Sequence, residues 1–290
     1  MSDLFDSDFF GRLNRLKLAM HIRLDRGLSG SRKSSEKGSS VEFSDFREYI
    51  PGDDIRRIDW NVYGRLDKLY VKQFMEEKEA FYHIFLDSSA SMDFGEKKKS
   101  VMALRLAAVF SWLVLKQLDR VEILSLKNGR LAKSMPTCGR GSFQLLLKSL
   151  EEQDFSGYTG INEAIKRYPL NGKGICILIS DFLDPEGIDE ALRYLLYKGQ
   201  EVLLVQVLAR EETDFNEEGT LSLTDMEDGS QVMVTMTGQA VKSYQEAVEN
   251  HTKKLMKTAK RYGCGFVRVL SDEDLDKVVF MTLKEKGIFA

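Results

Sequence analysis

An apolar run that ends in a carboxylate, between Phe81 and Ser91, constrains the fold more than any other part of the sequence. The run Phe-Tyr-His-Ile-Phe-Leu is short, aromatic and β-branched, and it leads directly into Asp87. This pattern predicts a strand that is covered on both faces. Ser89 and Ser91 follow at alternate positions, so the three polar side chains project to one side while the backbone stays extended. A metal site fits this spacing, and so does a polar strand end that leads into a serine-rich turn.

Strand-like and helical patterns alternate along the rest of the chain. Strands are predicted at residues 69–74, 121–126, 131–135, 174–180, 201–208 and 266–270, with a small hairpin at 220–225 and 231–236. Helices are predicted at residues 97–118, 143–150, 161–167, 188–197, 238–262 and 272–284, the last capped by Ser271. This alternation predicts an α/β fold with a doubly wound, mainly parallel sheet flanked by helices, of the Rossmann type.

In such a sheet, ligands collect at the carboxyl ends of the strands, where the winding direction reverses. Two predicted strands end in acids, Asp87 and Asp181, and Thr159 lies in a glycine-flanked loop before a predicted helix. We therefore expect one all-oxygen site made of Asp87, Ser89, Ser91, Thr159 and Asp181. Oxygen ligands without histidine or thiolate suit one Mg²⁺ or Mn²⁺ rather than zinc. An open coordination position would take an acidic side chain from another protein.

Residues 1–40 contain the only lopsided charge in the chain. Residues 9–28 have apolar side chains at helical spacing and an excess of Arg and Lys, which predicts a basic amphipathic helix. A Ser, Gly and Lys-rich stretch follows, and we expect it to be a mobile linker. A solvated helix face is favoured over a surface for a partner or for acidic lipid. RNA binding is a third possibility, but no aromatic side chains are interleaved to stack on bases.

Residues 41–78 are dense in aromatic, Arg and Asp residues. Four arginines alternate with four aspartates, namely Arg47, Arg56, Arg57 and Arg65 with Asp45, Asp53, Asp59 and Asp67. This pattern suggests bidentate ion pairs that fix a compact, irregular clasp packed on the main domain. The clasp is favoured over a separate binding site. The main α/β domain would then comprise residues 79–290.

Charge and cysteine content limit the environment and the partners of the protein. The net charge of −3 gives no reason to expect a nucleic acid partner. Three distant cysteines without C-x-x-C spacing argue against a disulfide framework and fit a reducing cytoplasm. The amino terminus is acidic where a signal peptide would be basic, and the longest apolar run, residues 106–115, is too short to span a bilayer. We expect a cytoplasmic protein with no transmembrane segment, and nothing specifies its oligomeric state.

An enzyme would have to use the same acids. Asp87 could be the nucleophile of a metal-dependent phosphoester hydrolase that also uses Asp181. The position two residues after Asp87 is Ser89 instead of a second aspartate, which leaves no evident general acid. The sequence contains no G-x-S-x-G, no H-E-x-x-H and no P-loop. His83 lies inside the predicted strand, where a core histidine is the favoured interpretation.

Two motifs carry a resemblance to known families. The D-x-S-x-S pattern, the loop threonine and the later strand-end aspartate resemble the metal-ion-dependent adhesion site of von Willebrand factor A domains. The stretch from Phe46 to Phe74, with Arg-Glu-Tyr-Ile-Pro-Gly-Asp-Asp-Ile-Arg-Arg-Ile-Asp-Trp, resembles the signature of the bacterial proteins called domain of unknown function 58. Two positions depart from the usual adhesion-site pattern, since Phe182 follows Asp181 and Tyr158 precedes Thr159 where glycine is common.

The resemblance extends from about Gly38 to the C-terminus and implies an A-type fold with a metal at the five oxygen-bearing residues. It also implies pairing with a MoxR-type AAA+ ATPase, in which the A domain is an adaptor for the assembly or activation of client proteins. Many members of the family carry N-terminal membrane helices, which are not found in this sequence. A non-enzymatic, metal-dependent protein-binding module is therefore the expected function.

Overall fold

The computed structural model describes residues 9–18, 41–76, 80–217, 219–224, 226 and 229–289. These residues form two compact units. The main unit combines residues 9–18 with residues 80–289, and the hairpin unit contains residues 41–76. The candidate site lies wholly within the main unit.

A mainly parallel sheet forms the centre of the main unit, with the strand order β11-β8-β7-β3-β4-β5. Its strands are β3 (Phe81–Asp87), β4 (Arg120–Lys127), β5 (Arg130–Lys133), β7 (Gly174–Ser180), β8 (Gln200–Leu208) and β11 (Gly265–Leu270). β5 is antiparallel to β4, and so is the two-residue β6 (Thr137–Cys138). The turn between β4 and β5 is the Asn128-Gly129 pair, with φ of 51° and 63°. The predicted fold class is confirmed.

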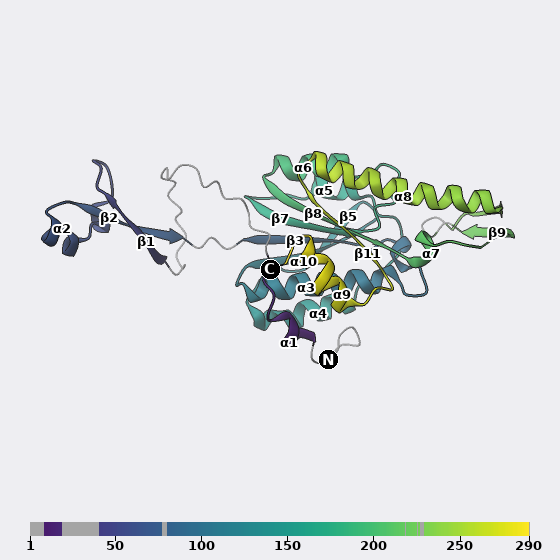
Figure 1. Cartoon of the computed structure of the whole chain (residues 1–290), viewed down its shortest axis with the longest axis horizontal. Coiled ribbons are helices and arrows are strands. Elements are labelled where there is room, and N and C mark those ends of the chain that lie inside the picture. Colours follow the sequence, from purple (N-terminus) through teal and green to yellow (C-terminus); the bar gives the residue numbers. More distant parts are fainter. Residues whose placement is uncertain are drawn as a thin grey trace. The chain divides into compact units, whose positions relative to one another are not determined.

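Helices cover both faces of this sheet (Figure 1). One face carries α3 (Lys99–Lys116) and α4 (Phe143–Glu151), and the other carries α5 (Ile161–Arg167), α6 (Asp189–Tyr197) and α8 (Gly238–Arg261). Each face has its own apolar core, and β3 serves both, since Ile84 and Leu86 join one cluster and Phe85 the other. His83 is buried in the same strand and its Nδ1 lies 2.7 Å from Glu122 Oε1, so it is a core histidine as predicted.

The winding direction reverses at β3. The chain proceeds from β3 to β4 on one side and later returns to β7 on the other side of β3. Asp87 ends β3, and Asp181 follows the last residue of β7. The topology thus brings the two strand-end acids to one edge of the sheet, as the alternation of elements predicts.

The N-terminal segment differs from the predicted helix over residues 9–28. α1 (Phe9–Leu13) ends after five residues, and residues 14–18 continue without helix. The carbonyls of Asn14 and Leu16 accept hydrogen bonds from Lys116, and Leu18 forms a β-bridge with Phe289. These tertiary contacts outweigh the helical periodicity. Residues 19–40, which include the predicted linker, lie outside the described residues.

The carboxyl-terminal half contains two further features. β9 (Gly219–Thr224) and β10 (Gln231–Met236) form the predicted hairpin, which follows the short α7 (Arg210–Thr213). The predicted closing helix is wrong at its start, because Asp274 rather than Ser271 is the N-cap. It consists of α9 (Leu275–Lys277), a π-helical turn (Val278–Thr282) and α10 (Leu283–Glu285). Among the described helices, none is both long and apolar enough to cross a membrane.

The hairpin unit is more regular than the predicted irregular clasp. β1 (Val41–Glu48) pairs antiparallel with β2 (Tyr70–Glu76), and the connection contains the 3₁₀ turn η1 (Ile55–Arg57) and α2 (Trp60–Leu66). Asp59 caps α2 by accepting hydrogen bonds from the amides of Asn61 and Val62. Trp60 and Leu66 are exposed on this helix.

The predicted alternation of Arg–Asp ion pairs is largely absent from the described residues of this unit. Arg47 pairs with Asp53 at 2.7 Å, whereas Asp59 pairs with Lys72 instead of an arginine. Asp54 is occupied as the N-cap of η1. Within residues 41–76, the guanidinium groups of the other three arginines form no ion pair, namely those of Arg56, Arg57 and Arg65. Backbone pairing and capping, rather than bidentate ion pairs, fix this segment.

Candidate metal centre

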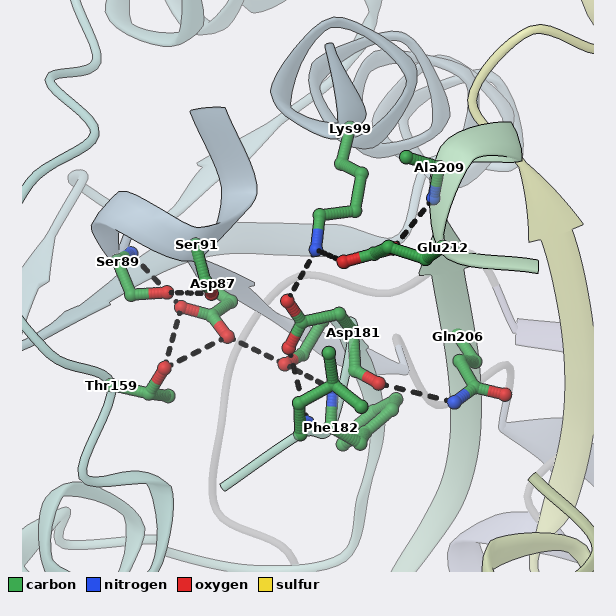
Figure 2. A network of polar contacts seen from close by, with 12 residues as sticks. Asp87, Ser89, Ser91, Lys99, Thr159, Asp181, Phe182, Gln206, Ala209 and Glu212 are labelled. Carbon is green, nitrogen blue, oxygen red and sulfur yellow. Dashed lines mark hydrogen bonds and ion pairs between the residues drawn. The ribbon is translucent and has the colours of Figure 1, made fainter. Parts of the chain in front are cut away.

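Asp87 is the centre of the site and is completely buried. Its carboxylate accepts hydrogen bonds from the Ser89 amide at 3.0 Å and from the Ser180 hydroxyl at 2.5 Å. The Thr159 hydroxyl lies 3.2 and 3.1 Å from the two carboxylate oxygens (Figure 2). All of these donors are neutral. The backbone turns away from the strand direction after Asp87 because η2 (Ala90–Asp93) follows at once.

The short η2 helix brings the two serine hydroxyls together. Ser89 Oγ lies 3.0 Å from Ser91 Oγ, and Ser89 is completely buried. Both side chains lie beside Asp87 (Figure 2). The three oxygen-bearing side chains of the D-x-S-x-S motif therefore lie together, as their alternate spacing predicts.

The loop that carries Thr159 is held by the turn between β4 and β5. The amide of Asn128 donates to the Tyr158 carbonyl at 2.6 Å, and the amide of Gly129 donates to the Thr159 carbonyl at 3.2 Å. Gly160 has φ of 60°, and a Cβ there would lie 2.7 Å from Gly129 Cα. Only glycine satisfies both conditions, so Gly160 sets the direction in which Thr159 approaches Asp87.

Asp181 completes the predicted set and has a different environment from Asp87. Its Oδ1 accepts a hydrogen bond from the Leu183 amide at 3.1 Å, and its Oδ2 lies 2.7 Å from Lys99 Nζ. Gln206 donates to its main-chain carbonyl at 3.1 Å. The structure thus brings all five predicted residues to one edge of the sheet (Figure 2).

The two aspartates differ in their charge compensation. Burial first, and the charge of Asp181 second, raise the pKa of Asp87 to about 6. No cationic side chain of the described residues pairs with Asp87, whereas Asp181 has Lys99. A buried carboxylate surrounded only by neutral donors is incompletely compensated at neutral pH. The described residues contain no cluster of three or more His, Cys, Asp or Glu side chains placed for a metal, so any ion here would depend on hydroxyl ligands.

Three residues of the site were not predicted: Lys99, Glu212 and Ser180. Lys99 is the last of three consecutive lysines, and composition gives no reason to choose it. Its position on the helix gives such a reason, because Met102, Ala103 and Leu106 lie three, four and seven residues later, on the same face of α3, and are all buried. Glu212 lies on α7 and is 113 residues away in the sequence, so no local pattern connects it to Lys99.

The two residues that depart from the adhesion-site pattern differ in their burial. Phe182 adopts a left-handed backbone conformation, with φ of 56°, in the position where glycine is common. Its amide donates to Ser180 Oγ at 2.9 Å and its carbonyl lies 2.8 Å from His251 Nε2, while its side chain is buried in the core cluster on the α8 face. Tyr158 is 47% exposed. A cavity of about 180 Å³ lies next to the site, and Thr159 and Ser180 contribute to its lining.

The donor set fits a hard divalent cation. It offers carboxylate and hydroxyl oxygens only, with a buried aspartate that lacks a positive partner among the described residues. Mg²⁺ and Mn²⁺ accept such ligands and keep some of their waters. Asp87, Ser89, Ser91 and Thr159 would hold the ion, and Asp181 would lie beside it.

The chain is similar over nearly its whole length to two mycobacterial proteins. An uncharacterized protein of Mycobacterium bovis and one of Mycobacterium tuberculosis are each 26% identical to this chain over 298 residues, covering 99% of this chain and 93% of the relative. Among solved structures, the conserved hypothetical protein BatB from Bacteroides thetaiotaomicron is 20% identical, with a TM-score of 0.46 over 71% of this chain and 98% of that one.

The SpRpn10 VWA domain is 8% identical, with a TM-score of 0.37 over 68% of this chain and 92% of that chain. The strand order and its reversal at β3 establish the α/β fold class independently of these distant likenesses. The sequence model described as "Protein of unknown function DUF58" matches residues 45–254, which is well over half of the chain. The chain belongs to the DUF58 family.

Proposed function

We propose that this protein is a non-enzymatic, metal-dependent protein-binding module. Asp87, Ser89, Ser91 and Thr159 hold one Mg²⁺ or Mn²⁺, with Asp181 beside it, and an acidic side chain of the partner completes the coordination. The observation that carries this proposal is the Asp87 carboxylate, which is completely buried and has only neutral hydrogen-bond donors among the described residues. A divalent cation compensates that charge and remains electron-poor enough to accept a carboxylate from another protein.

The surroundings of the site support a protein partner. Three apolar side chains that are partly exposed lie within three residues of a residue of the site in the sequence: Phe94 (37% exposed), Tyr158 (47%) and Leu183 (40%). Aromatic side chains are enriched in the cores of protein interfaces. A partner segment with an acidic residue flanked by apolar residues matches this arrangement.

The identity of the partner is proposed from the family. Membership of the DUF58 family supports pairing with a MoxR-type AAA+ ATPase, for which this protein would be an adaptor or cofactor in the assembly or activation of client complexes. The proposed place of this activity is the cytoplasm.

A phosphoester hydrolase that uses Asp87 and Asp181 is the competing hypothesis. Its second acid would have to exchange protons, yet Asp181 Oδ2 is held by Lys99 at 2.7 Å and Asp181 is 2% exposed. An ion-paired carboxylate is a poor general acid. The contacts of Asp181 therefore favour the binding module.

Affinity capture with a substitution of matched chemistry tests the proposal. Wild type, Asp87→Asn and Asp93→Asn are compared as baits in Mg²⁺ and in EDTA. Asp93 is also an aspartate of the η2 region, but among the described residues its carboxylate bonds to Lys98 and Ser100 rather than to the site. We expect wild type and Asp93→Asn to capture a MoxR-type ATPase in Mg²⁺ only, and Asp87→Asn to capture none. Equal capture by all three baits, or capture that persists in EDTA, would refute the proposed role of the metal.

A further inference from the structure

A fully buried lysine lies directly beside the proposed metal site. Lys99 is the first residue of α3 and is 0% exposed. Its Nζ lies 2.7 Å from Asp181 Oδ2 and 2.6 Å from Glu212 Oε1 (Figure 2). The centroid of the Phe94 ring is 5.8 Å from the same nitrogen. An ammonium group is buried in this way only when anionic partners compensate it.

Glu212 is itself fixed by the backbone. Its Oε2 accepts a hydrogen bond from the Ala209 amide at 2.7 Å at the start of α7, while Oε1 accepts the one from Lys99. The ammonium is therefore shared between two carboxylates on different elements, one at the end of β7 and one on α7. Neither contact extends to Asp87.

The charges of this cluster are unbalanced by two units. Asp87, Asp181 and Glu212 are three buried carboxylates, and Lys99 is the one ammonium that contacts any of them in the described residues. With all four groups ionised, two negative charges remain, which is the charge that one divalent cation neutralises. Because Lys99 is shared by Asp181 and Glu212, one of the two uncompensated charges is spread over that pair and the other lies at Asp87, which has no cationic partner among the described residues.

We propose that Lys99 is a positioning residue that sets the affinity of the metal site and makes the site depend on an acidic partner. This inference rests on the proposed metal-dependent function. Lys99 holds one oxygen of Asp181 and offsets part of its charge, so Asp87 is the one carboxylate of the site without a cationic partner among the described residues. A site with one such anionic ligand binds a divalent cation weakly until a partner supplies a second carboxylate. Metal binding and partner binding thereby become coupled.

Glu212 tunes this effect because it competes with Asp181 for the ammonium. When the charge of Glu212 is removed, Lys99 interacts with Asp181 alone and compensates it more completely. When both Lys99 and Glu212 are made neutral, Asp181 loses its cation and becomes available to the metal. The two substitutions are therefore expected to change the metal affinity in opposite directions.

The experiment measures Mn²⁺ binding to the purified full-length protein, without any partner, from the electron paramagnetic resonance signal of free Mn²⁺. We expect Lys99→Met/Glu212→Gln to lower the Mn²⁺ dissociation constant by about ten-fold or more, since Asp181 then has no cationic partner and its carboxylate is available to the ion. We expect Glu212→Gln alone to raise it by about three-fold. The double variant removes one positive and one negative charge together, which keeps the local charge balance of the wild type.

The directions of the two changes in the Mn²⁺ dissociation constant test the role of Lys99. A double variant that binds Mn²⁺ no more tightly than wild type would overturn the role of Lys99, and so would a Glu212→Gln variant with an unchanged or lowered dissociation constant. If the double variant does not fold, as judged by circular dichroism, Glu212→Gln alone decides. Mn²⁺ binding by neither protein would refute the proposed function, whereas binding by the double variant alone would support the inference about Lys99.

Discussion

The hydroxyl of Thr159 lies within 3.2 Å of both carboxylate oxygens of Asp87, although 72 residues separate the two in the sequence. Each residue reaches this contact on an independent element, Asp87 on β3 and Thr159 on a loop held by the turn between β4 and β5. A hydroxyl in this position can orient the carboxylate and can also offer its oxygen to a metal ion. The site is thus built from segments that the sheet topology brings together.

A variant that lacks the Thr159 hydroxyl but keeps the Asp87 carboxylate should bind the metal more weakly. We expect Mg²⁺ to raise the melting temperature of the wild type and of Thr159→Ser, and to have much less effect on Thr159→Val, which has nearly the same volume as threonine. Differential scanning fluorimetry with and without EDTA gives the comparison. An equal Mg²⁺ effect in Thr159→Val would mean that the hydroxyl is not a ligand.

The raised pKa of Asp87 predicts how the metal-free protein responds to pH. The folded-state pKa of about 6 lies above the ordinary value of 3.8, so the folded protein binds the proton more tightly than the unfolded chain does. This contribution to stability is complete below the unfolded value and is lost as the pH rises through about 6. In EDTA, Asp87→Asn should therefore gain stability relative to wild type between about pH 4 and pH 6.

Urea titrations of the two proteins at each pH measure this difference. Asp93→Asn is the control, because the side chain of Asp93 is 39% exposed whereas Asp87 is completely buried. A difference between wild type and Asp87→Asn that stays constant over this range would contradict the burial of an ionisable carboxylate at this position.

The left-handed backbone of Phe182 predicts an unusual order of stability. Phe182→Ala and Phe182→Gly both lose a side chain that is buried in the core, but alanine keeps a Cβ at φ of 56° and glycine does not. Glycine should therefore be the more stable replacement by about 1 kcal/mol, the opposite of the usual order. Chemical denaturation of both variants tests this order, and a more stable alanine variant would exclude the left-handed conformation.

A similar argument applies at the end of α3, where no buried side chain is involved. Leu118 has φ of 64° and is 65% exposed just beyond the helix. Leu118→Gly should stabilise the protein by about 1 kcal/mol, since glycine is the preferred residue in this position. Leu145 is 64% exposed inside α4, so Leu145→Gly is the matched control and should cost about 1 kcal/mol. The two thermal shifts should have opposite signs.

In the hairpin unit, caps rather than arginine pairs should carry the stability. Asp59 caps α2 and pairs with Lys72 at 3.0 Å, while Arg56 forms no ion pair among the described residues. Asp59→Ala should lower the melting temperature of this unit, and Arg56→Ala should leave it unchanged. Limited proteolysis of the two variants at increasing temperature makes the comparison, and a destabilised Arg56→Ala variant would restore the idea of an arginine clasp.

The sheet and the five oxygen-bearing residues were predictable because they depend on local periodicity and on one topological rule. An apolar run followed by an acid predicts a strand end, and parallel strands end at the same edge, so Asp87 and Asp181 were expected to be neighbours. The extent of the N-terminal helix was not predictable in this way. Its apolar spacing continues past Leu13, but the backbone of residues 14–18 is engaged by Lys116 and Phe289, which are distant in the sequence.

The Lys99 cluster shows a second kind of limit. Ion pairs between residues far apart in the sequence follow no regular spacing, so a sequence can indicate at most one of the two partners. Here it indicates Lys99, which lies on the buried face of α3. Glu212 has a similar partial signal, since it lies three residues after Ala209 and its carboxylate caps that amide. Neither signal indicates that the two side chains meet.

The contacts at the two ends of the main unit have a consequence for how the chain can be divided. Leu18 pairs with Phe289 and Arg12 with Asp276, so the first described residues and the last are parts of one folded body. In the linear order of the chain, the hairpin unit is thus an insertion into the α/β domain rather than a module that precedes it. A fragment that starts at Ala80 would lack the apolar side chains of residues 9–18 beneath α3, whereas excision of the insertion with a short bridging sequence would retain them.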